Sequence, residues 1–299
     1  MKLSHFVAAA LTISAVVSAS TFGNVISFDP DGPAVGNPAY QVASIDFLVG
    51  NSIAVSGATS PQSFTQLYQA RLGSLLDANG HVITVPGLNA PGGFEITVIA
   101  GYNANGTVSG AGPGSTITSH LIPGDQTGFV KLFYHPTAPH ASDLNGTGFN
   151  DDHLIYSGTI TAASAIFMIT NGISPLDLFN TANWPTNTTV NGIGGLSLSA
   201  ATSTFDPAFF ASGINLMTVD ANTSTALPYR ETDPSKQFVN LNGTFRVPNI
   251  GGPTGTNGVT GTDILIQADA NAAFTPEPAS LGLLGLGTLG LLARRRPNA

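Results

Sequence analysis

Short hydrophobic or alternating stretches, separated by polar turns, run through the middle of the chain. They lie at residues 45–49, 64–72, 81–85, 94–102, 129–134, 154–160, 165–170, 196–200, 216–220, 238–245 and 264–268. Residues 64–70 and 95–98 partly alternate between apolar and polar side chains, which is typical of strands in a sheet with one wet face. Asn-Gly pairs at 79–80, 105–106 and 145–146 predict turns. The pattern therefore predicts an all-β fold.

The number and shortness of these strands predict a β-sandwich, jelly-roll-like, in which one domain occupies residues 20–275. No stretch keeps a sustained helical period. The best candidate for a short helix is 174–179, where Ser174 caps the start and Pro175 occupies the first position. Residues 249–261, which are rich in Gly, Thr and Asn, are expected to form a loop or linker.

The N-terminal residues have the three parts of an export signal. Lys2 supplies a positive start, residues 6–17 form a short apolar run, and small residues end at Ala19. This order predicts a secretory signal peptide at 1–19, cut after Ala19 by the signal peptidase of the secretion machinery. A buried N-terminal helix is the alternative. The export signal implies that the domain folds outside the cytoplasm.

A second signal of three parts ends the chain. Pro276, Glu277 and Pro278 come first, an apolar run follows at 279–293, and the cluster Arg294, Arg295 and Arg296 closes it. As a helix the apolar run is about 22 Å long, which is short of the roughly 30 Å hydrocarbon core of a bilayer. We therefore expect a short transmembrane helix that holds the protein briefly, with its arginines on the cytoplasmic side. A permanent tail anchor is the alternative.

This order of parts over 276–299 resembles the PEP-CTERM sorting signal. The resemblance implies recognition by exosortase, a membrane enzyme that cuts near the Pro-Glu-Pro and releases the protein or transfers it to the cell surface. It further implies transient anchoring in the inner membrane, followed by location at the cell surface or in the extracellular matrix.

Charge and composition exclude several kinds of function. Between residues 20 and 275 there are five basic and sixteen acidic side chains, so the net charge is 5 − 16 = −11. Such a surface repels phosphate backbones, which excludes nucleic acid as a partner. The chain has no Cys, which excludes disulfides, thiolate metal sites and a Cys nucleophile. Apolar residues make up 42% of the chain, and this is enough for a hydrophobic core.

The densest polar stretch, 135–153, offers a candidate calcium site. Asp143, Asn145, Asp151 and Asp152 place oxygen ligands on a glycine-containing loop, as Ca²⁺ requires. The spacing is not that of an EF-hand, because Leu154 occupies the twelfth position, where a bidentate Glu is needed. Ordinary turn chemistry accounts for the same residues equally well. Calcium is thus a candidate, and no cofactor is required.

The same stretch offers a second candidate metal site, for zinc or copper. Its ligands would be His135, His140 and His153. Neutral imidazoles need further groups to orient them, and the sequence does not show such groups.

Evidence for an enzyme is weak. No Gly-x-Ser-x-Gly elbow occurs, since residues 195–199 lack the second glycine. A glycosidase needs two opposed carboxylates, and the glutamates before the tail are Glu95 and Glu231. Glu95 begins an alternating strand and is expected to be a solvated charge. We therefore predict no catalytic residues, and a secreted polysaccharide hydrolase is the least favoured alternative.

Several blocks in the domain resemble flocculation-associated PEP-CTERM proteins. These blocks are 145–151 with the following strand 154–160, together with 64–70 and 95–102. The resemblance implies a non-enzymatic surface protein that promotes flocculation or biofilm formation together with extracellular polysaccharide. No block is recognised over 186–229. An alternative is a carbohydrate-binding module that stacks sugars on Trp184, Tyr68 or Tyr102.

Overall fold

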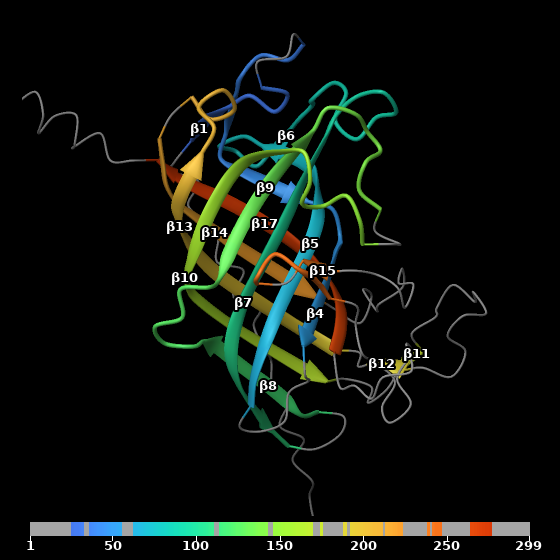
Figure 1. Cartoon of the computed structure of the whole chain (residues 1–299), viewed down its shortest axis with the longest axis vertical. Coiled ribbons are helices and arrows are strands. Elements are labelled where there is room, and N and C mark those ends of the chain that lie inside the picture. Colours follow the sequence, from blue (N-terminus) through green and yellow to red (C-terminus); the bar gives the residue numbers. More distant parts are fainter. Residues whose placement is uncertain are drawn as a thin grey trace, which may run out of the picture.

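A computed structural model describes residues 25–32, 36–55, 62–110, 114–142, 146–169, 174–175, 188–189, 192–211, 213–223, 238–239, 241–246 and 264–276. All regular elements within these ranges are β-strands (Figure 1). Within them, no helix has the length and apolar character needed to cross a bilayer. The predicted signal peptide at 1–19 and the predicted sorting helix at 279–293 lie outside the described residues.

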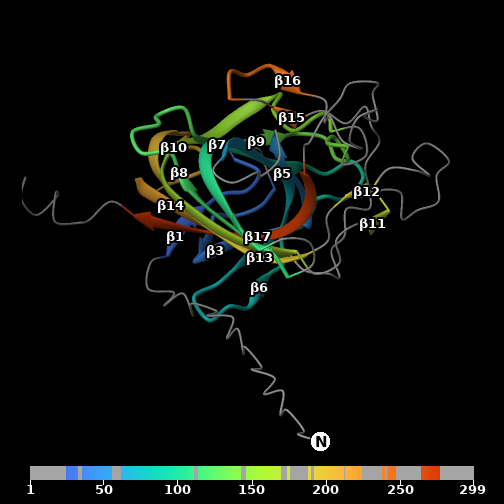
Figure 2. The ribbon, with the colours of Figure 1, turned by 90° about the horizontal axis from the view of Figure 1, so that it is seen from below.

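The main sheet is an antiparallel meander that closes on itself into a barrel (Figure 2). Its strands are β3 (Ser44–Phe47), β4 (Gly50–Val55), β5 (Gln62–Leu76), β7 (Glu95–Ser109), β8 (Thr116–Leu121), β9 (Phe129–His135), β10 (His153–Ile169), β13 (Gly192–Phe205), β14 (Ile214–Thr223) and β17 (Ile264–Pro276), with β6 (Val82–Ile83) added beside β5. The short strands β3 and β4 share one position in the ring, because each pairs with a different part of the same two neighbours, β5 and β17. In the same way, β8 and β9 share one position between β7 and β10. In the described part of the chain, these strands therefore fill eight positions around the ring.

The predicted β-sandwich is wrong, although the all-β class is confirmed. β17 pairs with β3 and β4, so the last strand of the meander joins the first and no open edge remains between them. A sandwich would leave two sheets with free edges, whereas closure removes them. Alternating side chains look the same in either arrangement, because in both each strand has one buried face.

Local predictions had mixed outcomes. The stretches 64–72 and 94–102 lie in β5 and β7, which extend well beyond them. A turn does occur at Gly80, whose φ is 78°. The predicted turn at 105–106 is wrong, since Gly106 is paired with Gln62 inside β7. The predicted helix at 174–179 is also wrong at its start, because Ser174–Pro175 forms β11 and pairs with β12 (Thr188–Thr189); the remainder of that segment lies outside the described residues.

Aromatic rings fill one end of the barrel. There β1 (Ile26–Phe28) pairs with β2 (Tyr40–Val42), and the amide of Asp29 donates to the carbonyl of Phe209 at 2.8 Å. We call the packed rings of Phe28, Tyr156, Phe205, Phe210 and Phe274 the aromatic plug. Smaller side chains, such as Ala268, Ala270 and Ala272 of β17, line the interior beyond it. An eight-stranded barrel is narrow enough to be filled in this way.

A carboxyl pair next to the aromatic plug gives a pH-dependent prediction. Burial, followed by the hydrogen bond and charge of Asp31, raises the pKa of Asp29 from 3.8 to about 6. Between pH 4 and 6 the folded state therefore holds a proton that the unfolded state has lost, so stability falls as the pH rises. We expect Asp29→Asn to remove this fall and to raise the free energy of unfolding at pH 7 by on the order of 1 kcal/mol.

The measurement is urea denaturation of wild type and Asp29→Asn at pH 4 and pH 7. The two proteins should differ little at pH 4 and diverge by pH 7. A constant difference across this range would contradict the assignment of the proton to Asp29.

Candidate functional site

A loop covers the outer face of the barrel between β9 and β10. Its described parts, 136–142 and 146–152, lie over outward-facing side chains of β7 and β9. Ile99, Phe133, Ala141 and Phe149 pack there as a small apolar cluster that is separate from the barrel interior. The covered face also contains polar side chains, which is unusual for a buried surface unless each polar group is paired.

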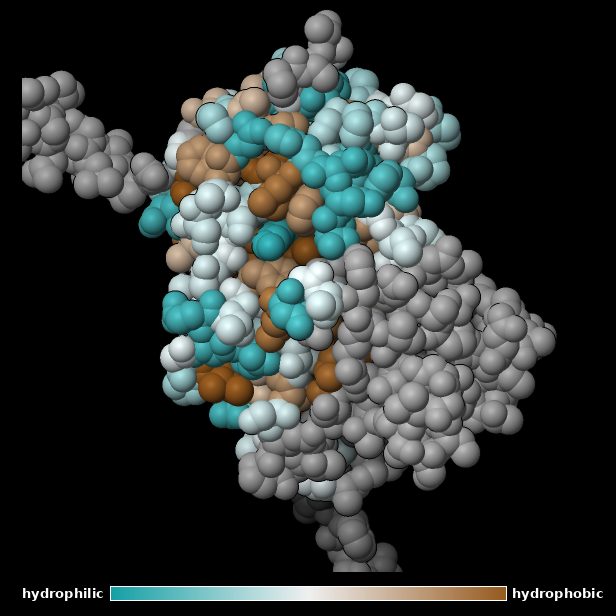
Figure 3. All heavy atoms as spheres, viewed as in Figure 1, coloured by the Kyte–Doolittle hydropathy of each residue, from teal (hydrophilic) through white to brown (hydrophobic). Residues whose placement is uncertain are grey.

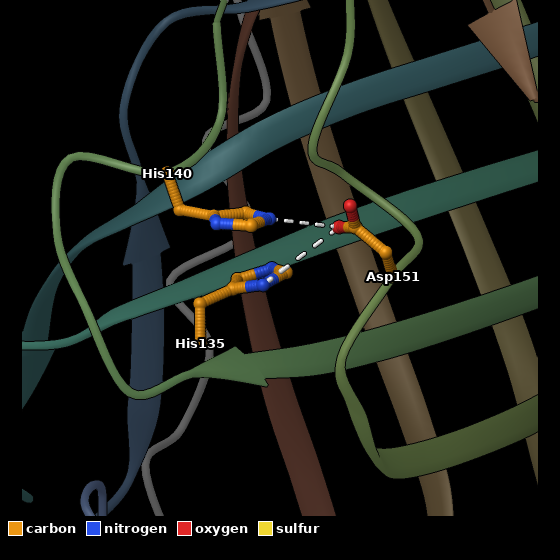
Figure 4. Close-up of side chains that lie close together, drawn as sticks. All are labelled: His135, His140 and Asp151. Atoms are coloured by element: carbon orange, nitrogen blue, oxygen red, sulfur yellow. Dashed lines mark hydrogen bonds and ion pairs between the residues drawn. The ribbon is translucent and has the colours of Figure 1, made fainter.

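Two histidines and two aspartates meet at the edge of this loop, and we call them the His–Asp cluster. His140 Nε2 lies 3.0 Å from Asp151 Oδ1, and His135 Nδ1 lies 3.1 Å from Asp152 Oδ2. The crossed distances, from His135 Nδ1 to Asp151 Oδ1 and from His140 Nε2 to Asp152 Oδ2, are both 3.8 Å. The two imidazoles are stacked with their centroids 4.2 Å apart, and both turn nitrogens toward Asp151 (Figure 4).

Thr97 of β7 orients the buried histidine. Thr97 Oγ1 donates its one proton to the carbonyl of Phe149 at 2.9 Å. The same oxygen lies 2.9 Å from His135 Nε2, so it accepts a proton from that nitrogen. In the neutral ring the lone pair is consequently on Nδ1, which faces the two aspartates.

His135 is buried within the site, whereas its partners reach solvent. The His135 side chain is 0% exposed, against 30% for His140, 55% for Asp151 and 43% for Asp152. Burial lowers the pKa of His135 below its ordinary value, and this outweighs the hydrogen bond that Asp152 accepts from the protonated ring, which acts in the opposite direction. The neutral imidazole is the form that binds metal ions.

Glu95 attaches the loop to the barrel. The expectation of a solvated charge is wrong, because Glu95 is 0% exposed beneath the loop. Its Oε1 accepts the amide proton of Ala141 at 2.8 Å and its Oε2 that of His140 at 3.4 Å, while Arg71 Nη1 lies 3.9 Å from Oε2. Outward orientation was correctly expected, but the sequence does not show that a distant loop covers that face.

Each of the two predicted metal sites is only partly assembled in the structure: some of its residues lie in the His–Asp cluster and others do not. Of the calcium candidates, Asp151 and Asp152 lie in the His–Asp cluster, and Asp143 and Asn145 lie outside the described residues. Of the histidine set, His135 and His140 lie together. His153 does not join them, because its Nε2 bonds to Asp206 Oδ2 at 2.6 Å.

Sequence reasoning considered the carboxylates and the histidines separately and missed their combination. It also missed Thr97, whose position in an alternating strand gave no signal of a role. A further feature visible in the structure is the backbone of Asp152, which has φ 59°, a left-handed conformation uncommon outside glycine. That conformation aims the Asp152 carboxylate back at His135.

The aromatic residues proposed to stack sugars are not on the surface. Tyr68 is 9% exposed and Tyr102 is 3% exposed, and both line a cavity of about 100 Å³ in the barrel interior, away from the aromatic plug. This volume is below the roughly 300–1,000 Å³ of ordinary ligand pockets. Trp184 lies outside the described residues. Neither tyrosine therefore offers an open ring face to a polysaccharide.

The sorting residues lie at the end of the last barrel strand. Pro276 is the final residue of β17 and pairs with Ile214. Ala19, Glu277, Pro278 and the arginines Arg294, Arg295 and Arg296 lie outside the described residues. Phe274, two residues before the end of β17, is 2% exposed in the aromatic plug. The start of the sorting segment is thus attached directly to the folded domain.

Comparisons with known proteins give one match. The family model for the PEP-CTERM protein-sorting motif matches residues 274–296. No curated protein and no solved structure matches the chain. The match includes the Pro-Glu-Pro, the apolar run and the arginine cluster, which confirms the sorting signal predicted from the sequence. The chain therefore carries a PEP-CTERM sorting signal at residues 274–296, and this motif indicates export and processing by exosortase.

Proposed function

We propose that this chain is a non-enzymatic protein of the cell surface and extracellular matrix that promotes flocculation or biofilm formation together with exopolysaccharide. The observation that carries the proposal is the sorting motif at 274–296, which directs the domain to exosortase and outward. On this route, signal peptidase removes residues 1–19. The tail then anchors the protein transiently in the inner membrane, and exosortase releases it to the surface or matrix.

The outer face of the barrel supports a role among polysaccharides. Hydroxyl and amide side chains of β5, β7 and β8 bond across neighbouring strands on this face. These pairs are Ser63 Oγ to Asn105 Oδ1, Thr65 Oγ1 to Asn103 Oδ1, and Thr107 with Thr118, each at 2.8 Å. Such groups keep further lone pairs and protons with which to bond sugar hydroxyls. The described surface in Figure 3 accordingly shows many pale, near-neutral residues between the hydrophilic and hydrophobic ones.

The net charge of −11 between residues 20 and 275 suits the same role. It keeps a protein with few charged residues soluble and disfavours self-association at low ionic strength. Divalent cations could then link it to acidic polysaccharide. The filled barrel interior, with a cavity of about 100 Å³, supports a structural role over a hydrolytic one.

The proposal predicts that sorting and aggregation depend on the Pro-Glu-Pro. In the cells that produce this protein, deletion of its gene should reduce floc and biofilm mass, and re-expression of wild type should restore it. Re-expression of the triple variant Pro276→Ala, Glu277→Ala, Pro278→Ala should not restore floc or biofilm mass. Mass spectrometry of the extracellular wild-type protein should find a C-terminus that lacks Arg294–Arg296, because exosortase acts before the helix.

Pro297→Ala, behind the arginine cluster, is the matched control and should behave as wild type. Recovery of an extracellular form intact to Ala299 would contradict processing. Undiminished aggregation in the deletion strain, together with normal processing of the protein in wild-type cells, would contradict the matrix role alone.

A further inference from the structure

The His–Asp cluster contains an electrostatic conflict. His135 Nε2 donates to Thr97, so the neutral ring directs its Nδ1 lone pair at Asp152 Oδ2, 3.1 Å away. A lone pair facing a carboxylate oxygen at hydrogen-bond distance is repulsive unless a proton or a cation lies between them. A bound cation removes this repulsion, because the Nδ1 lone pair and the carboxylate oxygens can all bind to it.

The spacing of the donor atoms suits a small, four-coordinate ion: those of His135, His140 and Asp151 all lie within 4.8 Å of one another, and Asp152 Oδ2 lies 3.1 Å from His135 Nδ1. Zinc held at about 2.0–2.1 Å in a tetrahedron places its ligand atoms about 3.3 Å apart. The four nitrogen-to-oxygen distances in the His–Asp cluster are 3.0, 3.1, 3.8 and 3.8 Å. Shifts of about half an ångström in the side chains of His140, Asp151 and Asp152, which are 30–55% exposed, bring these nitrogen-to-oxygen distances to that separation.

The donor types favour a transition metal over calcium. Two imidazole nitrogens and two carboxylate oxygens suit Zn²⁺, whereas Ca²⁺ takes six to eight oxygens. The two aspartates carry two negative charges, which a divalent ion balances. Thr97, through its bond to His135 Nε2, is the outer group that commonly orients a metal-binding histidine.

We propose that His135 Nδ1, His140 Nε2, Asp151 and Asp152 bind a zinc-class divalent metal ion that clamps segments 136–142 and 146–152 to the outer face of β7 and β9. The ion joins the end of β9 to the residues just before β10. It thereby fixes the two ends of the loop, and because the ion binds the folded chain and not the unfolded one, its binding free energy stabilises the folded state. In an exported chain without cysteine, this metal clamp occupies the place that a disulfide takes in many secreted proteins.

The test is titration of the purified full-length chain, held in mild detergent, with ZnCl₂ by calorimetry and thermal unfolding. We expect one zinc ion per chain, and a rise in Tm of about 5–10 °C when free zinc is a hundred times Kd. CaCl₂ should give no comparable shift. Absence of zinc binding, or an equal response to calcium, would overturn the proposal.

Variants locate the site. His140→Ala and Asp151→Asn change partly exposed side chains and should fold, yet each should weaken zinc affinity by more than about 100-fold, beyond the usual loss for an orienting group. Thr97→Val should weaken it by about 10–100-fold. His153→Gln is the matched control, since His153 pairs with Asp206, and it should bind zinc as wild type does. Wild-type affinity in His140→Ala, or lost affinity in His153→Gln, would refute the assignment.

The clamp itself has a separate readout. Amide hydrogen exchange at Ala141 and Gly146 should slow on addition of zinc in wild type, because both amides lie in the segments that the ion holds. In His140→Ala their exchange should not respond. Exchange that is insensitive to zinc in wild type would show that the ion does not hold the loop.

Discussion

Phe210→Ala is expected to lower the free energy of unfolding by about 4 kcal/mol, because it removes a large ring from the hydrophobic core. Phe210 is 1% exposed at the centre of the aromatic plug. Its ring lies 4.8 Å from that of Phe28 and 5.5 Å from that of Phe274, measured between centroids. Alanine would leave a cavity that these rings cannot fill, since they belong to separate strands. Urea denaturation followed by tryptophan and tyrosine fluorescence measures the change.

Val82→Ala is the matched control, because Val82 is 66% exposed on β6. Its effect should stay within about 0.5 kcal/mol. If Phe210→Ala cost no more than this control, the end of the barrel would not be packed as described.

Glu95→Ala is expected to lower the free energy of unfolding by about 3 kcal/mol. The substitution removes a fully buried carboxylate that accepts the amide of Ala141 at 2.8 Å and lies 3.9 Å from the Arg71 guanidinium. The Ala141 amide would then lose its acceptor beneath the loop, and Arg71 would lose its nearby negative charge. The expected result is a lower urea midpoint, together with faster amide exchange across 136–142.

Glu95→Gln separates the two causes. Its amide oxygen can still accept from Ala141, so it should lose clearly less stability than Glu95→Ala. Equal losses would mean that the negative charge alone matters. A loss below about 0.5 kcal/mol in Glu95→Ala would mean that Glu95 is solvated, as its place in an alternating strand suggested.

The strands were predictable because their signal is local. In β7, Ile96, Val98 and Tyr102 face the interior while Thr97 faces outward, and this period of two is visible in the sequence. The ends of the strands were less predictable. β7 continues through Asn105-Gly106, a pair that favours a turn, because pairing with β5 and β8 on either side holds it extended.

The candidate site was only half predictable. The polar stretch 135–153 was recognisable as the place where metal chemistry could occur, and His135, His140 and Asp151 do meet there, with Asp152 beside the two histidines. The sequence could not show which side chains meet, because His140 and His153 are both histidines in the same polar stretch and nothing local distinguishes them. Loop geometry turns His140 toward Asp151, and β10 carries His153 to Asp206. Thr97 reaches His135 across the β7–β9 pairing, where Thr97 is the register neighbour of Phe133.

By itself, the sequence determined that this is an all-β protein with a PEP-CTERM tail. Both signals are local: the alternation of side chains marks each strand, and the tail motif is a continuous segment, so neither depends on which distant residues lie nearby in space. Only the tertiary structure decided that the sheet closes into a barrel, that Glu95 is buried, and that two histidines face two aspartates. The physical reason is that each of these depends on contacts between distant segments. Asp46 pairs with Asn271, and Glu95 with the Ala141 amide, and no local pattern specifies either contact.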